Sequence, residues 1–91
     1  MGEAVRLTPD QRELLEVLAE AAASREYRPE MLCAPDIVAL VRRDGTYVPT
    51  TLDGRDLAAV LTGGCVAPAG EELYRLTAVG RASLAGRPAK R

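Results

Sequence analysis

The chain has 91 residues, enough for a single domain with one modest core, and its 12 basic and 13 acidic residues leave a net charge of −1. Phe and Trp are absent, so Leu, Val and Ala are expected to fill the core. No apolar run approaches the roughly 20 residues of a membrane span and the start lacks a signal peptide's apolar region, which predicts a cytoplasmic protein with no membrane partner.

The first predicted element is a helix over residues 9–24. Thr8 and Gln11 have the spacing of a capping box, and Pro9 stands at the first helical position. Apolar residues then recur at helical spacing, namely Leu14, Leu15, Leu18, Ala21 and Ala22. The other face is rich in acidic residues, and a polar loop containing Pro29 is expected to follow.

A short strand at residues 31–33 and a second helix are predicted next. Pro35 and Asp36 suit the first turn of that helix, and Gly45 is placed to end it. Its apolar stripe is Ile37, Leu40 and Val41. Residues 46–49 are expected to form a connector, because they are too few and too limited by proline for a central strand.

A third helix is predicted to begin between residues 50 and 53. Asp53 is the preferred N-cap, because Leu52 and Leu57 then form a hydrophobic staple. A cap at Thr50 or Thr51 is the alternative.

Glycines at residues 63–64 end this third helix. Residues 65–67 and 73–76 are predicted to be two strands of a hairpin, because a cluster of turn-forming residues separates them. Thr77 then caps a final helix over residues 78–85.

This order of elements resembles the winged helix-turn-helix superfamily of bacterial transcriptional regulators. The resemblance is carried by the phrase LTGGCV at residues 61–66 and the phrase YRLTAVGR at residues 74–81. It implies an α+β fold with a three-helix core, a small antiparallel sheet whose β-hairpin is the wing, and a short C-terminal helix. One domain over residues 1–86 would be followed by a flexible basic tail over residues 87–91.

Two packing expectations accompany this fold. The second strand of the wing would lie between the first strand and the other wing strand, so Cys33 and Cys65 would stand two strand spacings apart and stay reduced. Gly80 would let the final helix approach a neighbouring element closely, unless it is only a tolerated small residue.

The resemblance also implies binding to duplex DNA, with the third helix in the major groove and the wing along the backbone. The candidate nucleic-acid-binding residues are Thr50, Thr51, Arg55, Arg42, Arg43 and Arg75. Each has a plainer explanation as well, since threonines cap helices and arginines stabilise helix C-termini or solvated faces. On the third helix Arg55 stands beside Asp56, and Glu71 and Glu72 at the wing tip would repel phosphate.

Catalysis and metal binding find little support in the residue types. The chain has no His, and its two cysteines lack partner ligands for zinc. No nucleophile elbow, Gly-rich phosphate loop or recognisable set of carboxylates is present. We therefore expect a protein that is not an enzyme and holds no metal or cofactor.

Two functions remain open at this stage. The first is a small DNA-binding regulator of transcription, acting as a homodimer because one weakly basic copy would bind poorly. The alternative is a domain that binds another protein without significant DNA binding, through the third helix, the wing or the acidic first helix.

Overall fold

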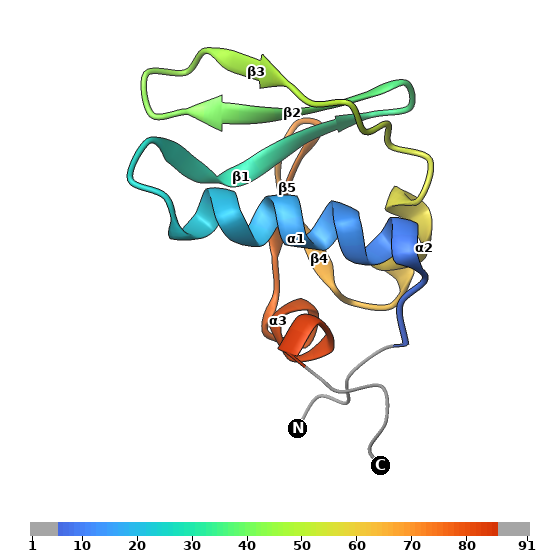
Figure 1. Cartoon of the computed structure of the whole chain (residues 1–91). Coiled ribbons are helices and arrows are strands. Elements are labelled where there is room, and N and C mark those ends of the chain that lie inside the picture. The colour runs from blue at the N-terminus through green and yellow to red at the C-terminus, as the bar shows by residue number, and fades with distance from the viewer. Residues whose placement is uncertain (1–5, 86–91) are drawn as a thin grey trace.

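One antiparallel sheet of five strands and three helices make up residues 6–85, the part of the chain that this computed structural model describes (Figure 1). The elements in chain order are α1 (Pro9–Ala23), β1 (Tyr27–Ala34), β2 (Ile37–Arg42), β3 (Tyr47–Pro49), α2 (Leu57–Thr62), β4 (Val66–Gly70), β5 (Leu73–Leu76) and α3 (Ala78–Ala85). The strands are ordered β3-β2-β1-β5-β4 across the sheet. Figure 1 shows α1 lying across β1 and β5. The predicted tail over residues 87–91 lies outside the described residues.

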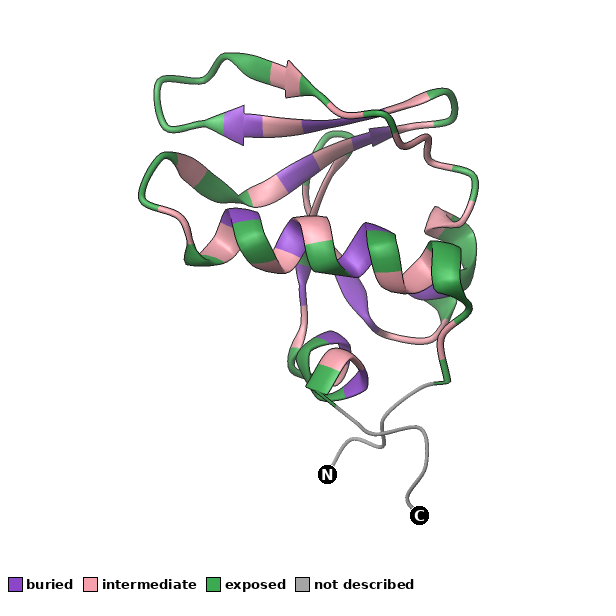
Figure 2. Ribbon diagram, viewed as in Figure 1, coloured by how far each residue is buried: buried purple, intermediate pink, exposed green. Residues whose placement is uncertain are grey.

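The core lies between α1 and the sheet and is aliphatic, as the composition predicts (Figure 2). Its buried members are Leu14, Leu15, Leu18, Met31, Cys33, Val38, Val60, Cys65, Val66 and Leu76. Each methylene group removed from water contributes about 0.8 kcal/mol, so this cluster is the main source of stability. Within residues 6–85 no helix combines the length and the apolar character needed to span a membrane.

Helix α1 begins as predicted. The amide of Gln11 donates to the Thr8 hydroxyl, and the amide of Thr8 donates to the Gln11 side chain, both at 3.1 Å. This reciprocal pair satisfies two amides that a helix start leaves unpaired. The helix ends at Ala23, within one residue of the predicted end, and its buried side faces the sheet.

Residues 37–42 form strand β2, so the predicted second helix is wrong. Val38, Ala39 and Val41 are all buried, and neighbouring residues of a strand point to opposite faces, so β2 is covered on both sides. A strand buried on both faces is apolar throughout, and the same residues therefore also match the spacing of a helical stripe. Pro35 and Asp36 form the turn between β1 and β2 instead of the first turn of a helix.

The winged helix-turn-helix fold is wrong for the same reason. That fold needs two successive helices before the wing, and in this chain strands β2 and β3 stand where the first of the two should be. The sheet has five strands, more than a small wing hairpin and its partner provide. The general α+β class is right, and the architecture is a five-stranded antiparallel sheet with three helices.

Residues 47–49, predicted to be a connector, form the short edge strand β3. Tyr47 lies opposite Val41, and Pro49 lies opposite Ala39. Proline is tolerated there because an edge strand needs its amides on one side only. Gly45, predicted to end a helix, instead has φ +95° in the turn between β2 and β3.

The predicted order of the other three strands is confirmed. Strand β5 lies between β1 and β4. Cys33 and Cys65 are both buried and both free thiols. The predicted hairpin is also present, as β4 and β5.

Helix α2 begins at Leu57, four residues after the preferred cap. Asp53 accepts a hydrogen bond of 3.0 Å from the amide of Arg55, so it closes a turn and does not cap a helix. The backbone of Gly54 lies against the carbonyl of Ala34 at the end of β1, where a Cβ atom would overlap that oxygen. The helix ends at Thr62 with Gly63 as its C-cap, and Gly64 takes φ +80°, as a glycine after a helix end predicts.

The passage from β5 into α3 is as predicted. The hydroxyl of Thr77 accepts a hydrogen bond of 3.1 Å from the amide of Gly80 and also donates to the carbonyl of Gly64. A Cβ atom on Gly80 would overlap the carbonyl oxygen of Cys65. The close approach expected of this glycine is therefore confirmed.

Candidate nucleic-acid interface

Four exposed arginines meet at one end of the sheet, where the α1–β1 connection lies beside the β2–β3 turn. We call this group the arginine end, and its members are Arg25, Arg28, Arg42 and Arg43. The two loops that carry it lie at the same side of the molecule in Figure 1. The pairing of Tyr27 with Arg42 across β1 and β2 brings the two segments together.

Hydrogen bonds to backbone carbonyls hold the arginine end in place. Nε of Arg43 donates to the carbonyl oxygen of Arg25 at 2.6 Å, and Nη2 of Arg28 donates to that of Arg43 at 3.4 Å. The amide of Arg43 also donates to the carbonyl of Glu26 at 3.2 Å. Because a guanidinium has five N–H donors and carbonyls carry no charge, these arginines keep their charge and further donors.

Two carboxylates lie among the four arginines, which leaves residues 25–28 and 42–47 with a net charge of +2 in a chain of net charge −1. Glu26 is 3.9 Å from Arg42, and both side chains are largely exposed, so this pair holds Arg42 only weakly. Asp44 accepts from the amide and hydroxyl of Thr46. These bonds and Arg42 lower the pKa of Asp44 from 3.8, so it stays ionised at neutral pH.

Of the predicted binding residues, only Arg42 and Arg43 belong to the arginine end. Arg25 and Arg28 were not predicted to bind, because residues 25–30 were interpreted as a loop leaving the first helix. Recognising residues 27–34 as a strand paired with residues 37–42 would have placed both pairs of arginines together.

Thr50 has a structural role. Its hydroxyl donates to the carbonyl of Val38 at 2.7 Å and accepts from the amide of Leu52 at 3.1 Å. These bonds extend the contact between β2 and the segment after β3. The Thr50 hydroxyl is thus engaged within the fold.

Thr51 and Arg55 lie among carboxylates at another part of the surface. They line a hollow whose other charged residues are all acidic, namely Asp10, Glu13, Asp53 and Asp56. Arg55 is 3.2 Å from the Asp53 carboxylate, although its side chain is 83 % exposed. A phosphate would meet more negative than positive charge here.

Arg75 is exposed on β5, where it pairs with Ala67 of β4. It lines a shallow hollow with Arg81 of α3 and with Pro29 of β1. Arg75 is therefore grouped with Arg81 and is not one of the four residues of the arginine end.

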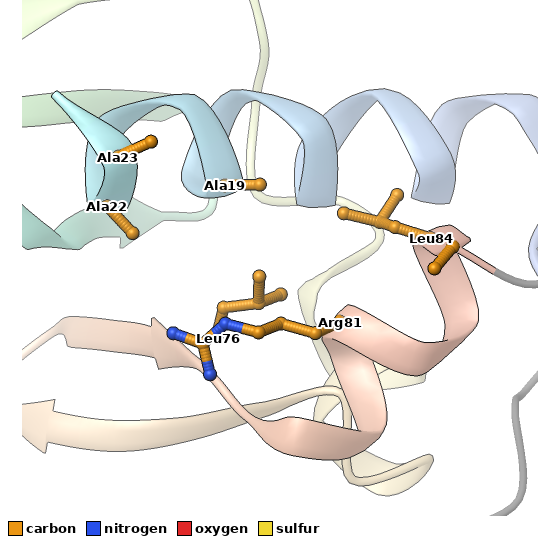
Figure 3. Close-up of a pocket in the computed structure, with 7 residues that line it drawn as sticks. Ala19, Ala22, Ala23, Leu76, Arg81 and Leu84 are labelled. Atoms are coloured by element: carbon orange, nitrogen blue, oxygen red, sulfur yellow. The ribbon is translucent and has the colours of Figure 1, made fainter.

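A second surface feature is an apolar groove between α1 and α3 (Figure 3). Its volume is about 450 Å³, and it is lined by Ala19, Ala22, Ala23, Leu76, Arg81, Leu84 and Ala85. Figure 3 shows the alanines on α1 across the gap from Leu76, Arg81 and Leu84. Arg81 is the one charged residue in this lining.

An apolar hollow of about 630 Å³ lies beside the end of β1, between Pro35, Leu57, Leu61 and Tyr74. Cys33 reaches its wall, and burial raises the pKa of that thiol to about 11. A thiol with so high a pKa is protonated at neutral pH and is a poor nucleophile. Cys33 is therefore not an activated nucleophile in this hollow.

Within residues 6–85 no three His, Cys, Asp or Glu side chains are grouped closely enough to hold a metal ion. Comparison of the sequence with models of known families, with curated proteins and with solved structures finds no match. The case for function therefore depends on the geometry of this chain.

Proposed function

We propose that this protein is a small nucleic-acid-binding domain that contacts the phosphate backbone through its arginine end. The observation that supports the proposal is the convergence of Arg25 and Arg28 with Arg42 and Arg43, which lie on two segments apart in the sequence. Guanidinium groups suit phosphate, because their planar N–H donors match two phosphate oxygens at once.

The fixed geometry of the arginine end favours this role. Arg43 and Arg28 already make backbone hydrogen bonds, so part of the entropy of ordering long side chains is lost on folding and is not lost again on binding. Each phosphate that is neutralised releases condensed counterions, which is the main source of affinity in non-specific binding.

The proposal moves the contact away from the third helix and the wing. Helix α2 has six residues, and its nearest arginine, Arg55, is paired with Asp53. The turn between β4 and β5 carries Glu71 and Glu72. We keep the transcriptional role, the cytoplasmic location and the homodimer as parts of the proposal, because two linked arginine ends would bind far more tightly than one.

Fluorescence anisotropy with a labelled mixed-sequence DNA, at about 50 and about 200 mM salt, tests the proposal. The wild type should bind at low salt and weaken steeply at high salt. The double variant Arg28→Ala with Arg42→Ala should lower the slope of log affinity against log salt by about two, because two phosphate contacts are lost.

The matched control is Arg55→Ala with Arg75→Ala, which removes the same charge from the predicted residues outside the arginine end. It should leave the salt slope unchanged. The proposal fails if the wild type does not bind at low salt, or if the two double variants lose affinity equally.

A second candidate function is a domain that binds protein in the α1–α3 groove. The specific observation is that Ala and Leu make up the whole lining except Arg81. A second copy of this chain fits such a groove, since its many carboxylates could pair with Arg81. Sedimentation equilibrium tests this candidate: Ala22→Arg should convert a dimer to a monomer, and an unchanged mass for the wild type and the variant would exclude the groove as the interface.

A further inference from the structure

Tyr47 is an exposed aromatic residue beside the arginine end. Its accessible area is 54 % of the maximum, the highest among the large apolar side chains of residues 6–85; the next, Leu61, reaches 37 %. Tyr47 opens the edge strand β3 and lies opposite Val41, the residue before Arg42. An apolar ring exposed to water is less favourable than a covered one, and a nucleic-acid base stacked on Tyr47 would remove that surface from water.

The turn that presents Tyr47 is held by several hydrogen bonds. The Asp44 carboxylate accepts from the amide of Thr46 at 2.9 Å and from its hydroxyl at 2.7 Å. The amide of Arg42 donates to the carbonyl of Thr46 at 2.8 Å, which closes the hairpin directly before Tyr47. The ring is therefore attached to an ordered backbone.

The two faces of the sheet separate Tyr47 from Arg42. Partners in an antiparallel ladder share a face, so Tyr47 lies on the face of Val41, and Arg42 belongs to the opposite face. A ligand that contacts both must bend around the end of the sheet. Single-stranded nucleic acid is flexible enough to bend around the end of the sheet. Duplex DNA is not, because its persistence length is about 150 base pairs.

No described element near the arginine end is shaped to enter a duplex groove. A major groove admits a helix or a free two-stranded ribbon. Strand β2 pairs with β1 on one side and with β3 on the other, so the β2–β3 hairpin is part of the sheet and does not project as a ribbon. Helix α1 ends beside these arginines with no basic residue in its last turn.

We propose that the arginine end binds single-stranded nucleic acid in preference to duplex, with one base stacked on Tyr47 and phosphates on Arg42 and Arg28. This inference rests on the proposed function and specifies its ligand. Base stacking on an aromatic ring tolerates any sequence, because every base has a π face. Binding is therefore expected to show weak sequence preference and strong salt dependence.

Anisotropy of the full chain with a labelled oligothymidylate of about twelve nucleotides, and with a duplex of the same length, tests the inference. The single strand should bind more tightly than the duplex. Tyr47→Ala should weaken single-strand binding roughly tenfold and leave duplex binding unchanged, because a stacking contact is lost and no charge changes. Tyr47→Phe, which keeps the ring, should bind as the wild type does.

The outcomes separate this inference from the proposed function. If both probes bind with salt dependence but the duplex binds more tightly, or if Tyr47→Ala binds the single strand as the wild type does, the inference is wrong and the proposed function stands. If neither probe binds at low salt, both are wrong. Polyglutamate at equal charge concentration is the competitor for the oligothymidylate. If it displaces the oligothymidylate, and Tyr47→Ala does not change oligothymidylate binding, the arginine end binds acidic protein segments and the inference is wrong.

Discussion

The guanidinium group of Arg12 donates a hydrogen bond of 3.1 Å to the carbonyl oxygen of Leu84, 72 residues further along the chain. A second N–H of the same group reaches the carbonyl oxygen of Ser83 at 3.5 Å. Both carbonyls belong to the end of α3, which has no basic residue in its own last turn. Arg12 therefore supplies from α1 the positive charge that a helix C-terminus favours.

Arg12→Ala should lower the free energy of unfolding by about 1 kcal/mol, because hydrogen bonds from a charged donor are lost from a partly exposed site. Urea unfolding followed by circular dichroism measures the change. Arg12→Lys keeps the charge without the forked donors and should recover only part of the loss. An Arg12→Ala variant as stable as the wild type would show that water serves these carbonyls equally well.

Gly80→Ala should destabilise the protein, although alanine is the better helix former by up to about 1 kcal/mol. The added Cβ would overlap the carbonyl oxygen of Cys65 and crowd the side chain of Leu76. We expect a loss of about 2 kcal/mol, as for other overpacked sites, measured by urea unfolding. Ala82→Gly on the exposed side of α3 is the control and should lose about 1 kcal/mol. A gain in stability on Gly80→Ala would contradict the close contact.

The stability of the protein should fall between about pH 8 and about pH 10 through Cys33. Burial raises the pKa of this thiol from 9.0 to about 11. Above pH 9.0 the unfolded chain loses this proton, whereas the folded protein retains it up to about pH 11. A rise in pH therefore favours unfolding, by about 1 kcal/mol between about pH 8 and about pH 10. Urea unfolding of the wild type and of Cys33→Ala at both pH values measures the effect. The prediction is wrong if the two proteins lose the same stability.

Asp44 should titrate below the ordinary pKa of 3.8 in the folded protein. Hydrogen bonds from the amide of Thr46 and then from its hydroxyl lower this pKa, and Arg42 adds a smaller effect. The stability that Asp44 contributes is present above pH 3.8 and is lost as the pH falls through the folded pKa. Carboxyl-carbon NMR during acid titration gives the midpoint. Thr46→Val removes only the hydroxyl and should reverse part of the shift; a wild-type midpoint at or above 3.8 would contradict the turn geometry.

Half of the arginine end could be anticipated from the sequence. Arg42 and Arg43 are adjacent, and a pair of arginines attracts notice in any sequence. Arg25 and Arg28 join them only through the ladder between β1 and β2, which brings Tyr27 opposite Arg42. Because residues 37–42 were assigned to a helix, that ladder could not be foreseen.

The sequence by itself determined the elements whose signals are local. The capping box at Thr8, the cap at Thr77 and the glycine ends of α2 depend on hydrogen bonds and backbone angles within a few residues, so the residue types alone predict them. The β4–β5 hairpin followed from a similar short-range pattern, whereas its place beside β1 was implied by the resemblance to winged-helix proteins.

Only the tertiary structure decided that residues 37–42 are a strand and that four arginines share one end of the sheet. An apolar run such as Ile37 to Val41 can bury one stripe as a helix or both faces as a strand, and its own residues do not distinguish the two. The choice depends on whether β1 and β3 lie on either side of residues 37–42 to pair with their backbone, and on whether other parts of the chain cover both faces of that strand. Strand β1 has charged residues and Pro29 in its first half, and β3 is short and ends at a proline, so neither is evident as a strand from its own residues. Their contribution appears only when the whole sheet is assembled.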